Sequence, residues 1–306
     1  MKAGVLYPNS MMPAMTTPFD LNDETSYQCW REQKLKLAPT SVADLIVEIN
    51  DPCQLSASEH AAMLERCQRS NMVIYAARQH SANKDIARLI GHQFGLESLD
   101  ANWLAGEDGI SEIKVSSSND LSRQTYIPYT NRPIKWHTDG YYNTPARRVR
   151  GMVLHCVHSA AEGGENHVMD HEMAYLLLRD ANPDFIRALC AADAMTIPER
   201  TDDDGVARAA QSGPVFSVDE NGKLHMRYTA RTRSIAWKQD EITLAAVAFL
   251  EQLLTANSPY IYAARLESGM GLLCNNVLHD RSGFTDNAAS PRLLYRARYF
   301  DRIAGS

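Results

Sequence analysis

The sequence lacks several features that would place the protein in a special class. It has no apolar run of the roughly 20 residues that a membrane-spanning helix needs, and no signal-like apolar stretch near its N-terminus. Its six cysteines are scattered without a Cys-x-x-Cys pair, which argues against a zinc ribbon or a disulfide framework. Internal repeats, low-complexity tracts and linkers are also absent. These absences predict a single globular domain, residues 1–306, located in the cytoplasm.

The charge balance says little about the binding partner. The chain has a formal net charge of -6, with 44% hydrophobic and 22% charged residues, which is an ordinary globular composition with ample apolar material for a core. A net negative charge gives no general attraction to nucleic acid or to an anionic membrane. We therefore expect a small-molecule substrate, no nucleic acid and no integral membrane segment, while a homo-oligomer stays open.

The stretch 136–142, WHTDGYY, is the part of the sequence most typical of a chemical site. On an extended strand, residues two apart point to the same face, so His137 and Asp139 could share one ion. A second imidazole from a distant strand would complete the two-His, one-carboxylate face of a six-coordinate non-haem Fe(II), and His279 is the candidate. A His-x-Asp tripeptide also arises by chance, and a histidine hydrogen-bonded to a carboxylate at a strand end is the alternative interpretation.

Residue patterns predict an α/β segment followed by a mainly β segment. Residues 1 to about 40 lack periodicity and are predicted to be an irregular lead-in. Ser56 and Glu59 form a capping-box pattern that opens a helix reaching about residue 70. From Ile113 onwards short β segments dominate, and the polar run 201–205 is predicted to be a solvated loop without metal. Further predicted strands cover 72–75, 148–158, 166–169, 215–218, 224–228, 260–266, 271–278 and 293–300, and further predicted helices cover about 83–95, 171–179, 182 onwards and 240–255.

These elements together predict the fold class. We expect a double-stranded β-helix, or jelly roll, over residues 126–302, built from two antiparallel sheets with helices packed outside it. Residues 1–125 are expected to form an α/β layer packed on this core. No firm internal domain boundary is visible.

Four short motifs together resemble a known enzyme family. The motifs are 137–139 (HTD), 163–166 (GGEN), 276–284 (NVLHDRSGF) and 292–296 (RLLYR). In this order and with these separations they resemble the Fe(II)/2-oxoglutarate dioxygenases of the TauD/TfdA and γ-butyrobetaine hydroxylase superfamily. The likeness covers roughly residues 125–302.

The resemblance implies a cofactor set and residues to hold it. His137, Asp139 and His279 would bind Fe(II), and the co-substrate 2-oxoglutarate would chelate the metal while leaving a position for O2. Arg292 matches the arginine that pairs with the distal carboxylate of 2-oxoglutarate, for which a planar guanidinium is well suited. Asn166 lies where many members carry threonine, and its amide could donate to the same carboxylate. The reaction implied is hydroxylation of an unactivated C–H bond with release of succinate and CO2.

The resemblance also suggests what kind of substrate is bound. Arg296 lies four residues after Arg292 and points to the same side of a regular strand, where taurine-type members carry an arginine for an anionic substrate group. A cationic substrate would be repelled there, so we expect a small anionic or polar substrate. Tyr141, Tyr142 and Asn143 could line its pocket, although two tyrosines after a strand are equally typical of a core.

The substrate itself is left open by the sequence. The run 147–150 (RRVR) could attract a phosphate-bearing or sugar-acid substrate, or it could be a solvated strand end. A sulfonate, a carboxylate, an amino acid and a sugar acid such as the Kdo of lipopolysaccharide are all compatible with the motifs. Desaturation or cyclisation could also replace hydroxylation.

Two other functions compete with this interpretation. His167 and His171 are four residues apart and, with Glu165 or Asp170, could bind zinc in a hydrolase. However, no glutamate follows His167 directly, as it does in His-Glu-x-x-His. The second alternative is a non-catalytic jelly-roll binding protein whose iron site has decayed, but such a protein has no need to keep all of the metal-binding motifs.

Overall fold

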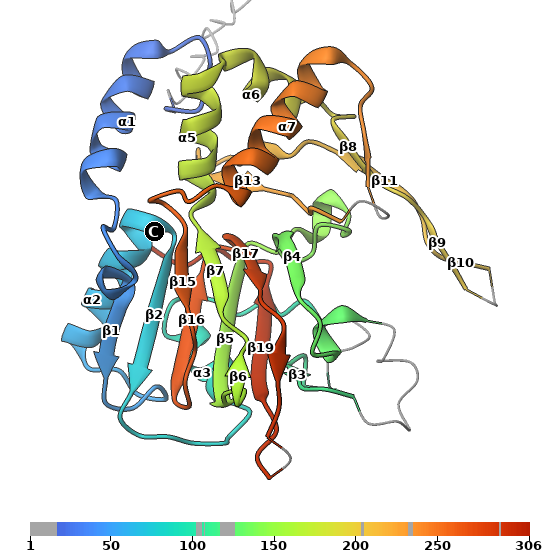
Figure 1. Cartoon of the computed structure of the whole chain (residues 1–306). Coiled ribbons are helices and arrows are strands. Elements are labelled where there is room, and N and C mark those ends of the chain that lie inside the picture. Colours follow the sequence, from blue (N-terminus) through green and yellow to red (C-terminus); the bar gives the residue numbers. More distant parts are fainter. Residues whose placement is uncertain are drawn as a thin grey trace, which may run out of the picture.

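A computed structural model describes residues 17–101, 106, 108–116, 126–202, 205–231, 235–287 and 289–306. In Figure 1 a body of strands occupies the lower half of the view and a group of helices lies above it. The helices are α1 (Glu24–Leu37), α2 (Ala57–Ser70), α3 (Ile86–His92), α5 (His171–Ala181), α6 (Pro183–Leu189) and α7 (Glu241–Thr255), with short 3-10 helices at Val42–Leu45, Ile127–Tyr129 and Pro145–Arg147. The strands are β1 (Ile46–Ile49), β2 (Met72–Ala77), β3 (Ser111–Ile113), β4 (Ile134–His137), β5 (Gly151–His158), β6 (Glu162–Gly163), β7 (Asn166–Met169), β8 (Met195–Ile197), β9 (Arg200–Asp202), β10 (Gly205–Arg208), β11 (Gln211–Gly213), β12 (Phe216–Val218), β13 (Leu224–Met226), β14 (Ala236–Trp237), β15 (Tyr262–Ala264), β16 (Met270–Cys274), β17 (Leu278–Arg281), β18 (Phe284–Thr285) and β19 (Leu293–Tyr299).

Two sheets form the roll. The larger has the order β1-β2-β16-β5-β19-β3, in which only the β1–β2 pair is parallel, and the smaller has the antiparallel order β15-β7-β17-β4. Their facing side chains share one hydrophobic cluster, to which β5 contributes Met152 and Cys156 and β7 contributes Val168. This arrangement confirms the predicted jelly-roll fold.

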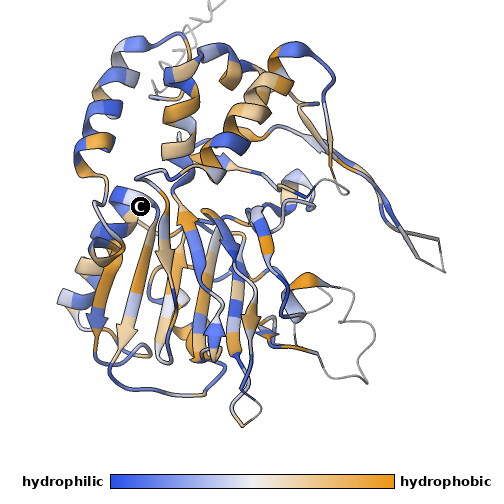
Figure 2. Cartoon of the chain, viewed as in Figure 1, coloured by the Kyte–Doolittle hydropathy of each residue, from blue (hydrophilic) through white to orange (hydrophobic). Residues whose placement is uncertain are grey.

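Alternation along β5 explains why that strand is apolar on both faces. Met152 and Cys156 point between the sheets, whereas Val153 and Val157 join a second cluster on the outer face, which α2 and α3 cover. The capping box at the start of α2 forms as predicted, since the Ser56 hydroxyl accepts from the Glu59 amide and the Glu59 carboxylate accepts from the Ser56 amide. In Figure 2 hydrophobic residues accordingly run along the strands of the large sheet.

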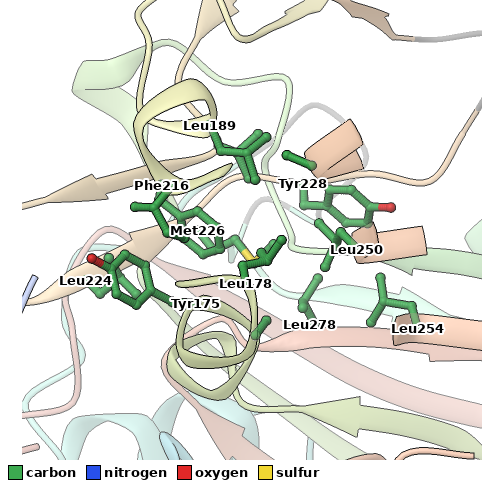
Figure 3. Close-up of a cluster of buried hydrophobic side chains, with 14 of the residues drawn as sticks. Tyr175, Leu178, Leu189, Phe216, Leu224, Met226, Tyr228, Leu250, Leu254 and Leu278 are labelled. Atoms are coloured by element: carbon green, nitrogen blue, oxygen red, sulfur yellow. The ribbon is translucent and has the colours of Figure 1, made fainter. Parts of the chain in front are cut away.

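A third hydrophobic cluster joins the helical group to the roll. In Figure 3, Leu178 of α5 and Leu250 of α7 lie close to Met226 of β13 and Leu278 of β17. Because Leu278 immediately precedes His279, this cluster fixes the strand that carries a candidate metal ligand. The cluster therefore couples helix packing to the position of the site.

Three predictions of local structure are wrong. The lead-in contains α1, whose N-cap Asp23 accepts from the Ser26 amide at 2.9 Å. Residues 201, 202 and 205 of the predicted loop lie in the paired strands β9 and β10, and residues 203 and 204 lie outside the described part of the chain. The strand predicted over 271–278 is two strands, β16 and β17, because Asn276 takes a left-handed φ of 50° between them.

Residues 1–125 do more than cover the core. The strands β1, β2 and β3 all belong to the six-stranded sheet, so this segment extends the sheet as well as adding helices. The single-domain division stays a prediction. Among the described helices, none is both long enough and apolar enough to cross a bilayer.

Candidate active site

The backbone ladder brings the two candidate histidine ligands together. His137 on β4 and His279 on β17 are direct partners in an antiparallel pair, and their ring centroids are 4.3 Å apart. Asp139 follows the end of β4, and the glycine after it, Gly140, has a φ of 68° that turns the chain away. One ligand atom from each of the three residues lies within 4.8 Å of the others. The structure thus assembles the predicted triad.

Backbone carbonyls fix the orientation of both imidazoles. The Nδ1 atom of His137 lies 2.9 Å from the Lys135 carbonyl, and that of His279 lies 2.9 Å from the Val277 carbonyl. Since a carbonyl only accepts, each Nδ1 carries a proton, and Nε2 is the ring atom left to bind a metal ion. Burial, together with the neighbouring His279, lowers the pKa of His137 to about 3, so this imidazole is neutral near pH 7. A neutral imidazole with Nδ1 held by a carbonyl is the form in which a histidine binds a metal ion through Nε2.

Asp139 is ionised and has one oxygen without a partner. Burial would raise its pKa, but the guanidinium groups of Arg296 and Arg298 hold it well below the usual range. The Oδ1 atom accepts from Arg296 Nη1 at 3.2 Å, whereas Oδ2 is buried without a hydrogen-bond partner. An orphaned carboxylate oxygen beside two free imidazole nitrogens fits an Fe(II) ion with three positions left open.

Arg292 is a buried cation that forms no ion pair within the described part of the chain. It is 4% exposed, and within the described chain no carboxylate lies within ion-pair distance of its guanidinium. The Phe284 ring lies beneath the guanidinium, with 5.0 Å between the guanidinium carbon and the ring centroid. Burial lowers the pKa of Arg292. Such a group fits the distal carboxylate of 2-oxoglutarate.

Asn166 lies near this region but is partly engaged. Its Nδ2 donates to the Asp280 carbonyl at 2.8 Å, and its Oδ1 is buried without a partner. One Nδ2 hydrogen is therefore left for another acceptor. A contact between Asn166 and 2-oxoglutarate stays a prediction.

The predicted substrate residues have different surroundings. The Tyr141 ring lies edge-on to His137 at 6.4 Å, which places it beside the triad. The Tyr142 hydroxyl accepts from Arg298 Nη1 at 3.0 Å. Asn143 closes the turn, because its backbone amide donates to the Gly140 carbonyl at 2.8 Å and its side chain to the Arg147 carbonyl at 2.9 Å. It also lines a cavity next to Asp139.

Sequence reasoning missed a polar row opposite the β4 motif. Thr229 is the antiparallel partner of His137, so Arg227, Thr229 and Arg231 point to the face that carries the triad. Arg227 Nε donates to the Tyr141 carbonyl at 2.7 Å, and Arg231 Nη1 lies 3.4 Å from the Tyr141 hydroxyl. The alternation over 225–231 (HMRYTAR) was the available signal, since Met226 and Tyr228 are core residues.

The alternative zinc pair is not assembled. His167 on β7 has its Nδ1 2.9 Å from Asp280 Oδ1, whereas His171 opens α5 and its Nε2 lies 3.2 Å from the Leu224 carbonyl. Of the residues that the structure describes, only His137, Asp139 and His279 form a group of three that could hold a metal ion.

Comparison with known proteins gives a consistent result. The family profile described as "Taurine catabolism dioxygenase TauD, TfdA family" matches residues 34–298. A curated relative, a uridine-5'-phosphate dioxygenase of Amycolatopsis sp., is 31% identical over 169 residues, which cover 54% of this chain and 60% of the relative. The match thus spans less than two thirds of that relative's length.

Solved structures share the fold at low identity. The non-haem iron oxygenase OrfP, in complex with Fe and α-ketoglutaric acid, matches with a TM-score of 0.57 and 14% identity, covering 90% of this chain and 91% of its own. A taurine dioxygenase from Burkholderia xenovorans matches with a TM-score of 0.55 and 16% identity, covering 86% of this chain and 89% of its own. An asparagine oxygenase bound to Fe(II), 3-hydroxyasparagine and succinate matches with a TM-score of 0.53 and 12% identity, covering 90% and 92%.

Proposed function

Because this chain belongs to the TauD, TfdA family of dioxygenases, we propose that it uses Fe(II), 2-oxoglutarate and O2 to hydroxylate a small phosphate-bearing molecule. The bound metal and co-substrate supply the oxidising power, and 2-oxoglutarate leaves as succinate and CO2. The observation that carries the proposal is the triad of His137, Asp139 and His279, whose free ligand atoms lie next to an arginine-rich wall.

The chain's own residues position the reactants. The two imidazoles and the Asp139 carboxylate would hold the ion, which would supply coordination positions for the co-substrate and O2. Arg292 binds the distal carboxylate of 2-oxoglutarate in a buried setting, where an ionic hydrogen bond is strong. Arg296 pairs with Asp139 and keeps this carboxylate ionised.

The charge distribution around the triad favours an anionic substrate. Arg231 contacts Tyr141, and Arg208 lies over the Tyr142 ring, with 5.7 Å between the guanidinium carbon and the ring centroid. Neither arginine has a carboxylate within ion-pair distance in the described chain. Aromatic rings flanked by uncompensated guanidinium groups suit a substrate that joins a flat ring to a phosphate. The similarity to a uridine-5'-phosphate dioxygenase supports a nucleoside monophosphate as the first candidate.

The first test is anaerobic titration of Fe(II) into the apo-protein with 2-oxoglutarate present. We expect the weak visible charge-transfer band of the chelate in the wild type and its loss in His279→Ala. His92, an exposed histidine, provides the matched control His92→Ala, which should keep the band. Absence of the band in the wild type, with tight zinc binding, would reject the iron assignment.

The second test identifies the substrate class by succinate release. Uridine 5'-phosphate, uridine, taurine and Kdo are compared under identical conditions. We expect stimulation by the nucleotide above that by the nucleoside. Stimulation by taurine or Kdo alone would replace the phosphate-bearing class with a sulfonate or a sugar acid.

A further inference from the structure

A cavity lies beside the triad, between the turn that follows β4 and the β12–β13 hairpin. The turn residues Thr138 to Tyr141 form one wall. Further polar side chains of the lining come from Asn143, Arg148, Ser212, Ser217, His225 and Arg227. Among the described residues that line the cavity, Asp139 is the only one with a carboxylate, and it is already committed to the triad and to Arg296.

The cations of this cavity are not neutralised. In the described part of the chain, the Arg148 guanidinium has neither a hydrogen-bond acceptor nor a carboxylate partner. Arg227 donates to four backbone carbonyls, those of Tyr141 at 2.7 Å, Gln211 at 2.7 Å, Met195 at 3.0 Å and Gly213 at 3.4 Å. Two guanidinium groups therefore line one cavity, and neither is paired with a carboxylate of the described chain.

The electrostatic consequence is visible in both arginines. Burial, and then the charge of Arg150, lower the pKa of Arg148. Burial, and then the charges of Arg148 and Arg208, lower the pKa of Arg227 to about 10. An anion in the cavity would remove this repulsion, so the cavity favours a ligand with concentrated negative charge.

The rest of the lining suits the oxygens of a phosphate. Ser217 is the direct strand partner of His225, so both side chains reach the cavity from the same face of the hairpin. The His225 Nε2 lies 3.3 Å from the Val149 carbonyl and therefore carries the proton, and burial lowers the pKa of this imidazole to about 3. The ring is thus neutral, and the Ser217 hydroxyl can donate alongside the guanidinium of Arg148.

We propose that this cavity is the subsite for the phosphate group of the substrate, with Arg148 as its main ligand and Arg227 as a fixed cation behind it. This inference rests on the proposed function, because it assumes a phosphate monoester on the substrate. Arg227 is held in place by four carbonyls before any ligand arrives, whereas Arg148 is free to form a two-pronged contact.

The direct test measures binding of inorganic phosphate to the enzyme loaded with Fe(II) and 2-oxoglutarate, by calorimetry without O2. We expect saturable binding by the wild type and a loss of about tenfold or more in affinity for Arg148→Gln. The matched control is Arg150→Gln, which removes the same charge two residues further along the chain. The Arg150 guanidinium faces Asp219, with 3.7 Å between Nη1 and Oδ2. We expect the control to stay within about threefold of the wild type.

The possible results are distinguishable. Equal losses in both variants would show a general field effect and overturn the subsite, as would the absence of saturable phosphate binding in the wild type. The chelate band, recorded on the same samples, reports folding and metal loading.

A second measurement separates this inference from the proposed function. The ratio of kcat/KM for uridine 5'-phosphate to that for uridine should fall about tenfold in Arg148→Gln and hold in Arg150→Gln. An unchanged ratio in both variants would reject the phosphate subsite without contradicting the proposed function. If phosphate binds through Arg148 but no phosphorylated compound stimulates succinate release, the proposed function fails while the anion site stands.

Discussion

The Asn276 side chain is hydrogen-bonded to both the backbone amide and the backbone carbonyl of Asp139. Its Oδ1 accepts from the Asp139 amide at 2.7 Å, and its Nδ2 donates to the Asp139 carbonyl at 2.9 Å. The same Nδ2 also donates to the Val149 carbonyl at 2.7 Å. Asn276, whose side chain makes these bonds, has a φ of 50° and lies between β16 and β17. The same residue therefore breaks the predicted strand and positions the Asp139 carboxylate.

Replacing this side chain should weaken metal binding. Glycine accepts the left-handed backbone, so Asn276→Gly removes the two contacts to Asp139 without adding backbone strain. We expect Fe(II) affinity to fall by about 10-fold to 100-fold, as is typical when a partner of a metal ligand is lost. Anaerobic Fe(II) titration measures this, and an unchanged affinity would show that Asp139 is positioned by other contacts. Asn287→Gly is a control at an exposed loop asparagine.

Loss of the Arg292 cation should affect 2-oxoglutarate rather than iron. In Arg292→Gln we expect KM for 2-oxoglutarate to rise by about 30-fold or more, because a buried charge-assisted contact disappears. Arg292→Lys keeps the charge but loses the planar guanidinium, so its KM for 2-oxoglutarate should lie between those of the wild type and Arg292→Gln. Fe(II) affinity measured without 2-oxoglutarate should stay the same. A KM within error of the wild type would place the co-substrate's carboxylate elsewhere.

Stability should fall as the pH drops below about 6.5, partly because of His155. Burial lowers the pKa of His155 to about 4, from an ordinary value of 6.5, and its Nδ1 lies 2.9 Å from the Tyr75 hydroxyl. Between these two pKa values the unfolded chain binds a proton that the folded chain excludes, so stability is present above pH 6.5 and is lost on acidification. For one histidine, the slope of the free energy of unfolding against pH is at most about 1.4 kcal/mol per pH unit.

Urea unfolding between about pH 7 and pH 5 measures this slope, a window that lies above the titration of most carboxylates. His155→Gln should reduce the slope. The control is His92→Gln, at an exposed histidine, and this variant should have the same slope as the wild type. Equal slopes for the wild type and His155→Gln would mean that His155 titrates normally in the folded protein.

Gly271 should tolerate no side chain. A Cβ there would lie 2.2 Å from Tyr75 Cζ and 2.5 Å from the Leu154 carbonyl oxygen, so the tyrosine and the strand pairing would both have to move. We expect Gly271→Ala to lower the free energy of unfolding by about 1–3 kcal/mol. For a Cβ at Gly283 the nearest atom would be 3.6 Å away. Gly283→Ala should therefore change the free energy of unfolding by less than about 1 kcal/mol. Similar denaturation midpoints for both variants would contradict the steric argument.

The sequence predicts the parts of the site that depend on local spacing. His137 and Asp139 are two residues apart at a strand end, and α7 shows a clear apolar stripe, so both could be recognised from pattern alone. The helix α1 could not, because it buries only Tyr27 and Lys34 and the rest of its residues face solvent or the edge of the core. A mostly polar helix carries little periodic signal.

Non-local pairing explains what else was missed in the site. The face on which Arg227 and Arg231 lie is set by the bridge between His137 and Thr229, which connects segments distant in the sequence. The role of Asn276 depends on its left-handed φ, which no spacing rule reveals. The motif around His279 identified a candidate ligand by resemblance, whereas the ladder between β4 and β17 shows how it reaches His137.

The direct pairing of His137 with His279 would give a bound metal ion a structural role as well as a chemical one. The β4–β17 ladder joins two segments that lie far apart in the chain, and a shared metal would act as a removable cross-link across it. Amide hydrogens of both strands should then exchange with deuterated solvent more slowly when the metal is bound, even though no backbone hydrogen bond is added. Metal supply would in this way set the lifetime of the folded roll as well as its chemistry.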